Sequence, residues 1–227
     1  MIQLNRRNVI LGSIAFGGLA LGAVQLFVVD LIGLNKAPKS TEVRQSSSAV
    51  DLTGLNDPPT FGEMTLGPDS AKVTIIEYAS ATCPHCAAFY NETFITLKKE
   101  YIDTGKIRFV FREYPHQDAA LAAFMVARCA PKEKYFPLID VFFLTQLEWT
   151  QNPQEGLFKI AQQAGFTKES FEACLKNETI AKQILEVRTK AEGFGVTGIP
   201  TFFVNSERYE GENTIEAFRA KIDPLLG

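Results

Sequence analysis

Two cysteines separated by two residues, Cys83 and Cys86, are the side chains of this chain best suited to carry out chemistry. They follow an apolar, β-branched run at 73–79 and precede residues 87–101, where apolar side chains repeat at helical spacing. A strand, a C-x-x-C pair and a helix in this order are typical of thiol redox proteins. Because the two sulfurs would lie within one helical turn, we expect a disulfide that can open and close.

The position of Cys83 just before the helix indicates which sulfur reacts. Free N–H groups and the positive end of the helix dipole stabilise a thiolate there. Pro84 lies where a missing N–H costs nothing, and His85 adds a donor or a positive charge nearby. We therefore predict that Cys83 is the nucleophile and that Cys86 lies one turn inside the helix. A stabilised thiolate favours the reduced form, so this disulfide would be a strong oxidant.

A lone C-x-x-C motif also has two other interpretations, half of a zinc site and an inert structural bridge. Structural zinc takes four ligands. The chain has four cysteines and two histidines, with neither a second C-x-x-C nor an H-x-x-x-H motif. We therefore expect no metal and no cofactor, and we interpret His116 as a residue at the start of a helix.

A carboxylic acid lies on the strand that leads to the cysteines. Glu77 precedes Cys83 on this strand and follows the apolar residues Ile75 and Ile76. One interpretation is a buried carboxyl group beneath the sulfurs, because burial raises a carboxyl pKa towards values useful for proton transfer. The alternative is a solvated glutamate on the polar face of an alternating strand. We favour the buried carboxyl group.

Two sequence motifs together resemble the DsbA-like branch of the thioredoxin superfamily. The first is Cys-Pro-His-Cys at 83–86 after Ile-Glu-Tyr-Ala-Ser at 76–80, and the second is Gly-Val-Thr-Gly-Ile-Pro-Thr-Phe-Phe-Val at 195–204. The resemblance covers about residues 60–227. Residues 112–115 and 127–130 look most like the four-cysteine DsbA proteins of alphaproteobacteria. The resemblance implies an α/β, thioredoxin-like fold with a helical domain inserted at about 116–192.

The resemblance also implies roles for Ile199 and Pro200. In this superfamily the proline of the second motif is cis and lies against the C-x-x-C motif. The cis bond would expose backbone polar groups of Ile199 to an extended substrate. The alternative is an ordinary trans proline that enters an edge strand. The superfamily also carries an acidic residue at the position of Glu77, which supports a role in taking or relaying a proton.

The remaining cysteines, Cys129 and Cys174, both lie in the expected helical insertion. In an oxidising compartment a leftover even pair of cysteines forms a bridge. The resemblance to four-cysteine DsbA proteins points the same way, so we predict a structural disulfide. The alternative is two buried free thiols that behave as small apolar side chains.

The rest of the chain divides into further elements. Apolar periodicity predicts helices at 119–129, 136–146, 154–164, 170–175 and 179–192. Residues 201–204 and 207–210 read as a hairpin around a turn at 205–206, and a final helix is expected from 214 to about 226. The strands on either side of the C-x-x-C helix make a βαβ unit, which is right-handed by default.

The N-terminal segment indicates the compartment. Arg6 and Arg7 precede an uncharged run at 9–29, which as a helix would span roughly 30 Å, about the thickness of a bilayer core. Residues 1–34 are therefore a signal peptide or a membrane anchor, and both remain open. Residues 35–60 contain serine and proline clusters without an apolar face, and we interpret them as a linker to a domain at 61–227.

These observations lead to one expected function and two alternatives. The formal net charge of −3 gives no basic excess for binding nucleic acid. We expect a monomeric periplasmic thiol:disulfide oxidoreductase, soluble or tethered to the inner membrane, that introduces disulfides into exported proteins. The resemblance implies reduced exported proteins as substrates and a DsbB-like membrane protein as reoxidant. The alternatives are a disulfide reductase or isomerase, and a chaperone-like peptide-binding module in which the cysteines are incidental.

Overall fold

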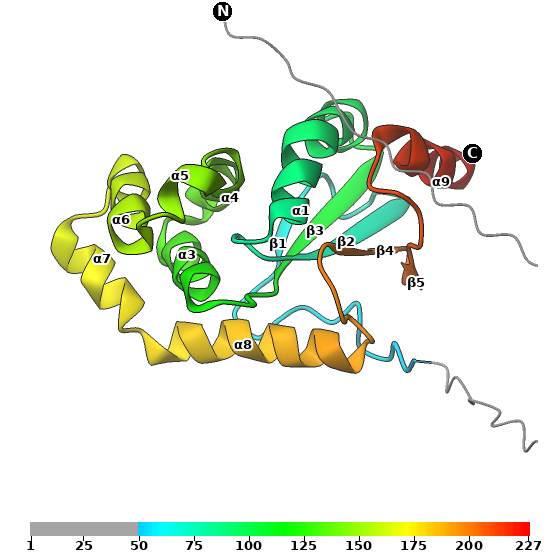
Figure 1. The fold of residues 1–227 in the computed structure, drawn as a ribbon. Helices are drawn as coiled ribbons and strands as arrows, with labels where there is room; N and C mark the ends of the chain where they lie inside the picture. Colours follow the sequence, from blue (N-terminus) through cyan, green and yellow to red (C-terminus); the bar gives the residue numbers. More distant parts are fainter. Residues whose placement is uncertain (1–49) are drawn as a thin grey trace, which may run out of the picture. The chain divides into compact units, whose positions relative to one another are not determined.

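A five-stranded mixed sheet lies at the centre of residues 50–227, the part of the chain that this computed structural model describes. The expected leader, residues 1–34, and the first part of the expected linker lie outside the described residues. The strand order is β1-β3-β2-β4-β5 (Figure 1), with β2 and β3 parallel and the other pairs antiparallel. The strands are β1 (Met64–Leu66), β2 (Val73–Ala79), β3 (Ile107–Glu113), β4 (Thr201–Val204) and β5 (Glu207–Arg208).

The helices between residues 118 and 175 gather beside the sheet, and the last two helices of the chain lie against its faces (Figure 1). A helical segment from 84 to 102 joins β2 to β3 and consists of α1 (Pro84–Ala88), α2 (Ile95–Leu97) and π-helical turns at Phe89–Phe94 and Lys98–Ile102. The helices that follow β3 are α3 (Asp118–Cys129), a 3-10 turn (Lys132–Lys134), α4 (Tyr135–Leu144), α5 (Gln146–Trp149), α6 (Pro153–Gln163), α7 (Lys168–Leu175), α8 (Glu178–Gly193) and, after β5, α9 (Ile215–Leu226).

The expected helix at 136–146 is divided in the structure. Thr145 has φ −107° and ψ 20° and stands between α4 and α5. Its hydroxyl and its N–H both donate to the Val141 carbonyl, at 2.8 and 2.9 Å, so the last turn of α4 closes at Thr145. Gln146 therefore opens a separate short helix, which apolar periodicity alone did not indicate.

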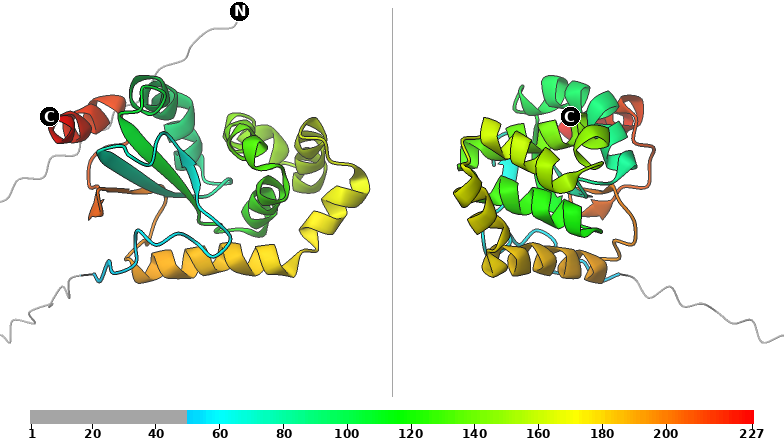
Figure 2. Two further views of the ribbon diagram at one scale, coloured as in Figure 1. Left: turned by 180° about the vertical axis from the view of Figure 1, so that it is seen from behind. Right: turned by 60° about the vertical axis from the view of Figure 1, so that its left-hand side comes forward.

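The two faces of the sheet bury different sets of residues, because successive side chains of a strand point to opposite faces. Ile75 lies in the larger core with Phe89 of the helical segment at 84–102 and Phe218 of α9, whereas Ile76 lies in the smaller core with Val187 of α8. Figures 1 and 2 show α1 and α9 on one side of the sheet and α8 on the other.

The expected linker extends less far than its composition indicated. Leu55 is 1% exposed and packs in the smaller core, so residues from about 50 onward belong to the folded part. The buried guanidinium of Arg112 donates a 2.6 Å hydrogen bond to the Leu55 carbonyl and pairs with Glu63. A segment held through backbone carbonyls and one leucine has no apolar period, which is why its sequence resembles a linker.

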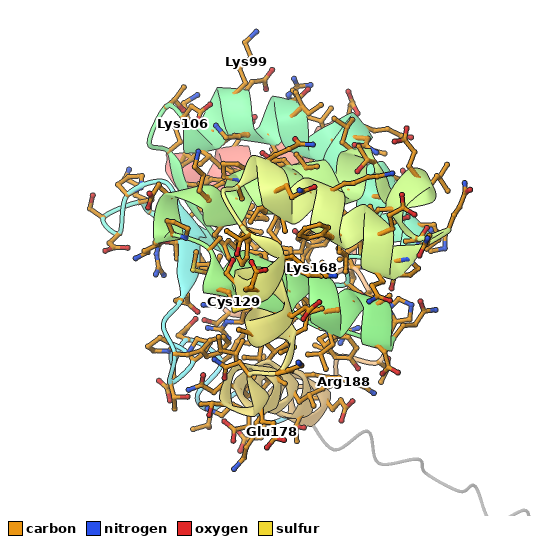
Figure 3. The ribbon with its side chains drawn as sticks, turned by 90° about the vertical axis from the view of Figure 1, so that its left-hand side faces the viewer. Lys99, Lys106, Cys129, Lys168, Glu178 and Arg188 are labelled. Atoms are coloured by element: carbon orange, nitrogen blue, oxygen red, sulfur yellow. A yellow bond between two sulfur atoms is a disulfide. The ribbon has the colours of Figure 1, made fainter. Side chains whose placement is uncertain are left out.

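A disulfide joins two helices of the insertion. Cys129 at the end of α3 and Cys174 in α7 are bonded, with their Cα atoms 6.1 Å apart. In the view of Figure 3, Cys129 lies between Lys99 and Lys106 at one end of the molecule and Glu178 and Arg188 of α8 at the other. Within residues 50–227, no helix has the length and apolar character needed to cross a bilayer.

Candidate active site

The two cysteines of the C-x-x-C motif lie where β2 ends and α1 begins. Cys83 is the N-cap of α1, with φ −84° and ψ 121°, and Pro84 occupies the first turn. The Cys83 N–H donates to the Ser80 carbonyl at 3.0 Å, and the Cys83 carbonyl accepts from the Ala87 N–H at 3.1 Å. The extended N-cap conformation therefore leaves the Cys83 side chain at the helix N-terminus, as the spacing predicts.

The two thiols are free in this structure but have very different surroundings. Cys83 is 5% exposed and Cys86 is 0% exposed. The Cys86 thiol and the backbone N–H groups of Cys86 and His85 donate to the Cys83 sulfur, and they lower the pKa of Cys83 to about 6 although burial opposes this. Burial raises the pKa of Cys86 well above its ordinary value. A thiolate is thus stabilised at Cys83 and disfavoured at Cys86.

The loop before β4 lies against the reactive sulfur. The peptide bond between Ile199 and Pro200 is cis, and the Cys83 thiol lies 3.5 Å from the Ile199 carbonyl oxygen. Antiparallel pairing of β4 with β2 places Thr201 opposite Tyr78 and so brings the loop to the end of β2. The loop and the C-x-x-C motif, far apart in the sequence, thus form one surface at which a backbone carbonyl meets a sulfur.

Glu77 lies beneath the site, on the larger-core face of β2. Its side chain is 0% exposed, and in register it is flanked by Phe111 of β3 and Phe202 of β4. Burial raises the pKa of Glu77 well above its ordinary value, while the nearby Tyr90 hydroxyl acts in the opposite direction. Neither carboxyl oxygen forms a hydrogen bond of ordinary geometry within the described residues. Burial in this apolar setting thus favours the neutral form of Glu77, and the residue is a buried carboxyl group rather than a solvated glutamate.

Two histidines contribute to the site in different ways. The His85 side chain is exposed, and this residue acts on Cys83 through its backbone N–H. The imidazole whose charge helps to lower the pKa of Cys83 is that of His116. His116 Nδ1 lies 2.8 Å from the hydroxyl of Ser80, a buried residue at the end of β2. From the sequence His116 was only a residue near a helix start, and α3 begins at Asp118.

A further residue, Gln146, reaches the site from the helical insertion. It is 6% exposed, and its side-chain amide donates hydrogen bonds to the carbonyls of Ala81 at 2.9 Å and Cys83 at 3.0 Å. Sequence reasoning missed this residue because a glutamine in a distant helix carries no motif. Its only signal is a polar side chain within an otherwise apolar stretch.

The Cys129–Cys174 disulfide is separate from this site. It joins α3 to α7, whereas Cys83, Cys86, Glu77, Ile199 and Pro200 meet at the end of β2. The arrangement at β2 provides one low-pKa sulfur, one high-pKa sulfur, a buried acid and a half-buried backbone segment. It can carry out thiol–disulfide exchange, in which the thiolate is the attacking and the leaving group.

We expect the alkylation of the reduced protein to distinguish the two thiols. The modification rate of Cys83 should reach half its maximum near pH 6, because its pKa is lowered to about 6 and only the thiolate reacts. Cys86 should stay unmodified over the same range, since its pKa is raised. Peptide mass spectrometry after timed exposure to iodoacetamide measures both rates, with free cysteine as the reference. Faster labelling of Cys86 would reverse the assignment of the nucleophile.

Comparisons with known proteins agree with this geometry. A family model described as thioredoxin matches residues 60–224. A Rickettsia bellii protein, provisionally named a protein-disulfide oxidoreductase, is 36% identical over 170 residues, which are 72% of this chain and 64% of that protein. The chain thus spans less than two thirds of that relative's length.

Solved structures show the same fold. The crystal structure of Wolbachia pipientis alpha-DsbA1 is 30% identical with a TM-score of 0.69, covering 75% of this chain and 94% of that one. Oxidised BdbD from Bacillus subtilis is 22% identical with a TM-score of 0.65, covering 74% and 96%, which supports the fold alone. The expected thioredoxin-like fold with a helical insertion is confirmed.

Proposed function

Because this chain belongs to the thioredoxin family and its structure is similar to that of a DsbA protein, we propose that it oxidises protein thiols to disulfides. The observation that carries the proposal is the contrast between the two thiols of one turn. The pKa of Cys83 is lowered to about 6, and that of Cys86 is raised by burial. When the reduced form of such a cysteine pair contains a stabilised thiolate, the disulfide of its oxidised form is readily reduced. The oxidised protein is then a strong oxidant of other thiols.

The exchange starts from a disulfide between Cys83 and Cys86. A substrate thiolate attacks the Cys83 sulfur, which lies next to the Ile199 carbonyl. A bond forms between the substrate sulfur and Cys83, the bond between the two cysteines breaks, and its electron pair leaves on Cys86. Because the pKa of Cys86 is raised, this sulfur takes up a proton. The carboxyl group of Glu77, whose pKa is also raised, is a nearby source of that proton.

The second step releases the product. A second substrate thiolate attacks the substrate sulfur of the mixed disulfide, and Cys83 leaves as a thiolate. Its low pKa makes it a good leaving group. The substrate has then lost two electrons and two protons to form one disulfide, and the dithiol of Cys83 and Cys86 has gained two electrons. During both steps, the backbone at Ile199 and Pro200 is placed to hold an extended substrate segment against Cys83.

The proposal includes the compartment and the partners. Disulfides persist in oxidising compartments, so we place the protein in the periplasm, soluble or tethered to the inner membrane through residues 1–34. Its substrates are reduced exported proteins. A DsbB-like membrane protein that accepts two electrons from Cys83 and Cys86 would restore the disulfide.

Oxidation of a reduced peptide with two cysteines tests the proposed function. The oxidised full-length protein should convert the peptide to its disulfide, and Cys83→Ser should lower the rate to that of the peptide alone, because no sulfur remains for attack. Mass spectrometry follows the peptide, and a glutathione equilibrium gives the reduction potential.

Three results would contradict an oxidase. A potential near about −270 mV would match a reductase such as thioredoxin. Reshuffling of mispaired disulfides without net oxidation would match an isomerase. A peptide-binding module would oxidise no peptide. It would still suppress aggregation, and Cys83→Ser would suppress aggregation equally well.

A further inference from the structure

The short helix α5 is hydrogen-bonded to the active-site turn through a buried side-chain amide. Gln146 donates through one nitrogen to the carbonyls of Ala81 and Cys83, at 2.9 and 3.0 Å. Both accepting residues are buried, with exposed fractions of 0% and 5%. These carbonyls lie on either side of Thr82, so the amide spans the backbone turn that leads from β2 into the reactive cysteine.

This turn determines where the Cys83 sulfur points. The sulfur lies 3.5 Å from the Ile199 carbonyl, and the N–H groups of His85 and Cys86 stabilise its thiolate. All of these contacts depend on the φ and ψ of Cys83, which is an N-cap in the extended region. The carbonyl that Gln146 holds is also the acceptor of the first helical hydrogen bond, from Ala87. A rotation of the Cys83 peptide would therefore move the sulfur and loosen the helix start together.

The amide is itself held in place by the helical insertion. The break at Thr145 sets Gln146 at the start of α5. The Thr150 hydroxyl donates to the Gln146 carbonyl at 2.6 Å, and the Trp149 indole donates to the Phe142 carbonyl at 2.8 Å. Gln146 thus projects from a packed element, which is a more precise support than a side chain on a mobile loop.

From this geometry we infer that Gln146 is a positioning residue for the thiol exchange, which holds the turn at residues 81–83 so that the Cys83 sulfur faces both its thiolate donors and the substrate loop. The inference rests on the proposed function, since it names a residue that prepares the same sulfur for exchange. It also assigns the helical insertion a part in the chemistry, through one side chain from α5.

Replacement of Gln146 tests this inference through the thiolate of Cys83. Gln146→Met keeps the length and the buried packing but removes both hydrogen bonds, and Gln146→Asn keeps an amide that is too short to reach. In both variants the pKa of Cys83 should rise by about one unit, so that the thiolate fraction well below the pKa falls about tenfold. The pH dependence of alkylation of the full-length reduced protein measures this shift, and peptide oxidation should slow in parallel.

Gln151→Met is the matched control. Gln151 follows the same helix, and its amide donates to the Leu147 carbonyl at 2.9 Å, away from the cysteines. Its replacement should leave the pKa of Cys83 and the oxidation rate unchanged. Near-ultraviolet circular dichroism and thermal unfolding establish that each variant is folded.

Two results would overturn the inference. If the pKa of Cys83 in the Gln146 variants equals that in the unchanged protein while their thermal stability falls, Gln146 contributes only to packing. If both variants fail to fold, Gln146 serves the fold rather than the position of the sulfur. Failure of the proposed function can be told apart from failure of this inference. Even if the unchanged protein oxidises no peptide, the pKa of Cys83 can still be measured in it and in its three variants.

Discussion

Replacement of Arg128 by methionine is expected to lower the free energy of unfolding by about 3–5 kcal/mol, because it leaves a buried carboxylate without its cation. The Arg128 side chain is 6% exposed and that of Glu113 is 0% exposed. The guanidinium donates to both carboxylate oxygens of Glu113, and the Tyr135 hydroxyl donates to one of them at 2.7 Å. The Arg128 guanidinium also donates to the Gly62 carbonyl at 2.9 Å. Urea unfolding of the variant beside the unchanged protein measures the difference.

A surface ion pair provides the control for this prediction. Arg219 donates three hydrogen bonds to Glu100, at 3.0, 2.7 and 2.9 Å, but the two side chains are 37% and 39% exposed. Arg219→Met should therefore destabilise the protein much less than Arg128→Met does, since solvent screens an exposed pair. A double variant with Arg128→Met and Glu113→Leu should recover much of the loss, because no buried charge is left unpaired. A loss for Arg128→Met no greater than that for Arg219→Met would contradict the importance of burial.

Removal of the disulfide between Cys129 and Cys174 is the second large change. The bond closes a loop with a sequence separation of 45 residues, and chain entropy gives it a stabilisation of about 3–4 kcal/mol. The double variant with alanine at both positions should lose about this amount in urea unfolding. Its rate of peptide oxidation should change less, because the bond joins α3 to α7 and not the elements that hold Cys83 and Cys86.

The unchanged protein and the double alanine variant must both have Cys83 and Cys86 oxidised when they are compared. The two proteins then differ only in the disulfide between Cys129 and Cys174. Digestion of protein purified without reductant should yield the linked peptides of Cys129 and Cys174. Two free thiols in that material, or unfolding midpoints that coincide, would contradict a structural bridge. If the double variant stays folded but its rate of peptide oxidation falls severely, the disulfide contributes to the function of the site and not only to stability.

The reactive pair and its setting could be predicted from the sequence because they depend on local spacing. Cys83 and Cys86 are three residues apart, and a β-branched strand precedes them, so one helix start determines which sulfur meets the N–H groups. The burial of Glu77 could be expected from its position on a central strand. The alternation of side chains along the strand did not by itself exclude a solvated glutamate. The boundary of the folded part was misjudged near Leu55, because one leucine and a buried arginine in another strand make no period.

The side chains that complete the site were decided only by the tertiary structure. Gln146 meets the Cys83 carbonyl across 63 residues of sequence, and His116 meets Ser80 across 36. Contacts at such separations depend on how the helical insertion packs against the βαβ unit, which local period and composition do not encode. The sequence by itself determined the chemistry, because a C-x-x-C pair at a helix start needs only neighbouring residues. Only the packing of distant helices decided which groups hold and charge that sulfur.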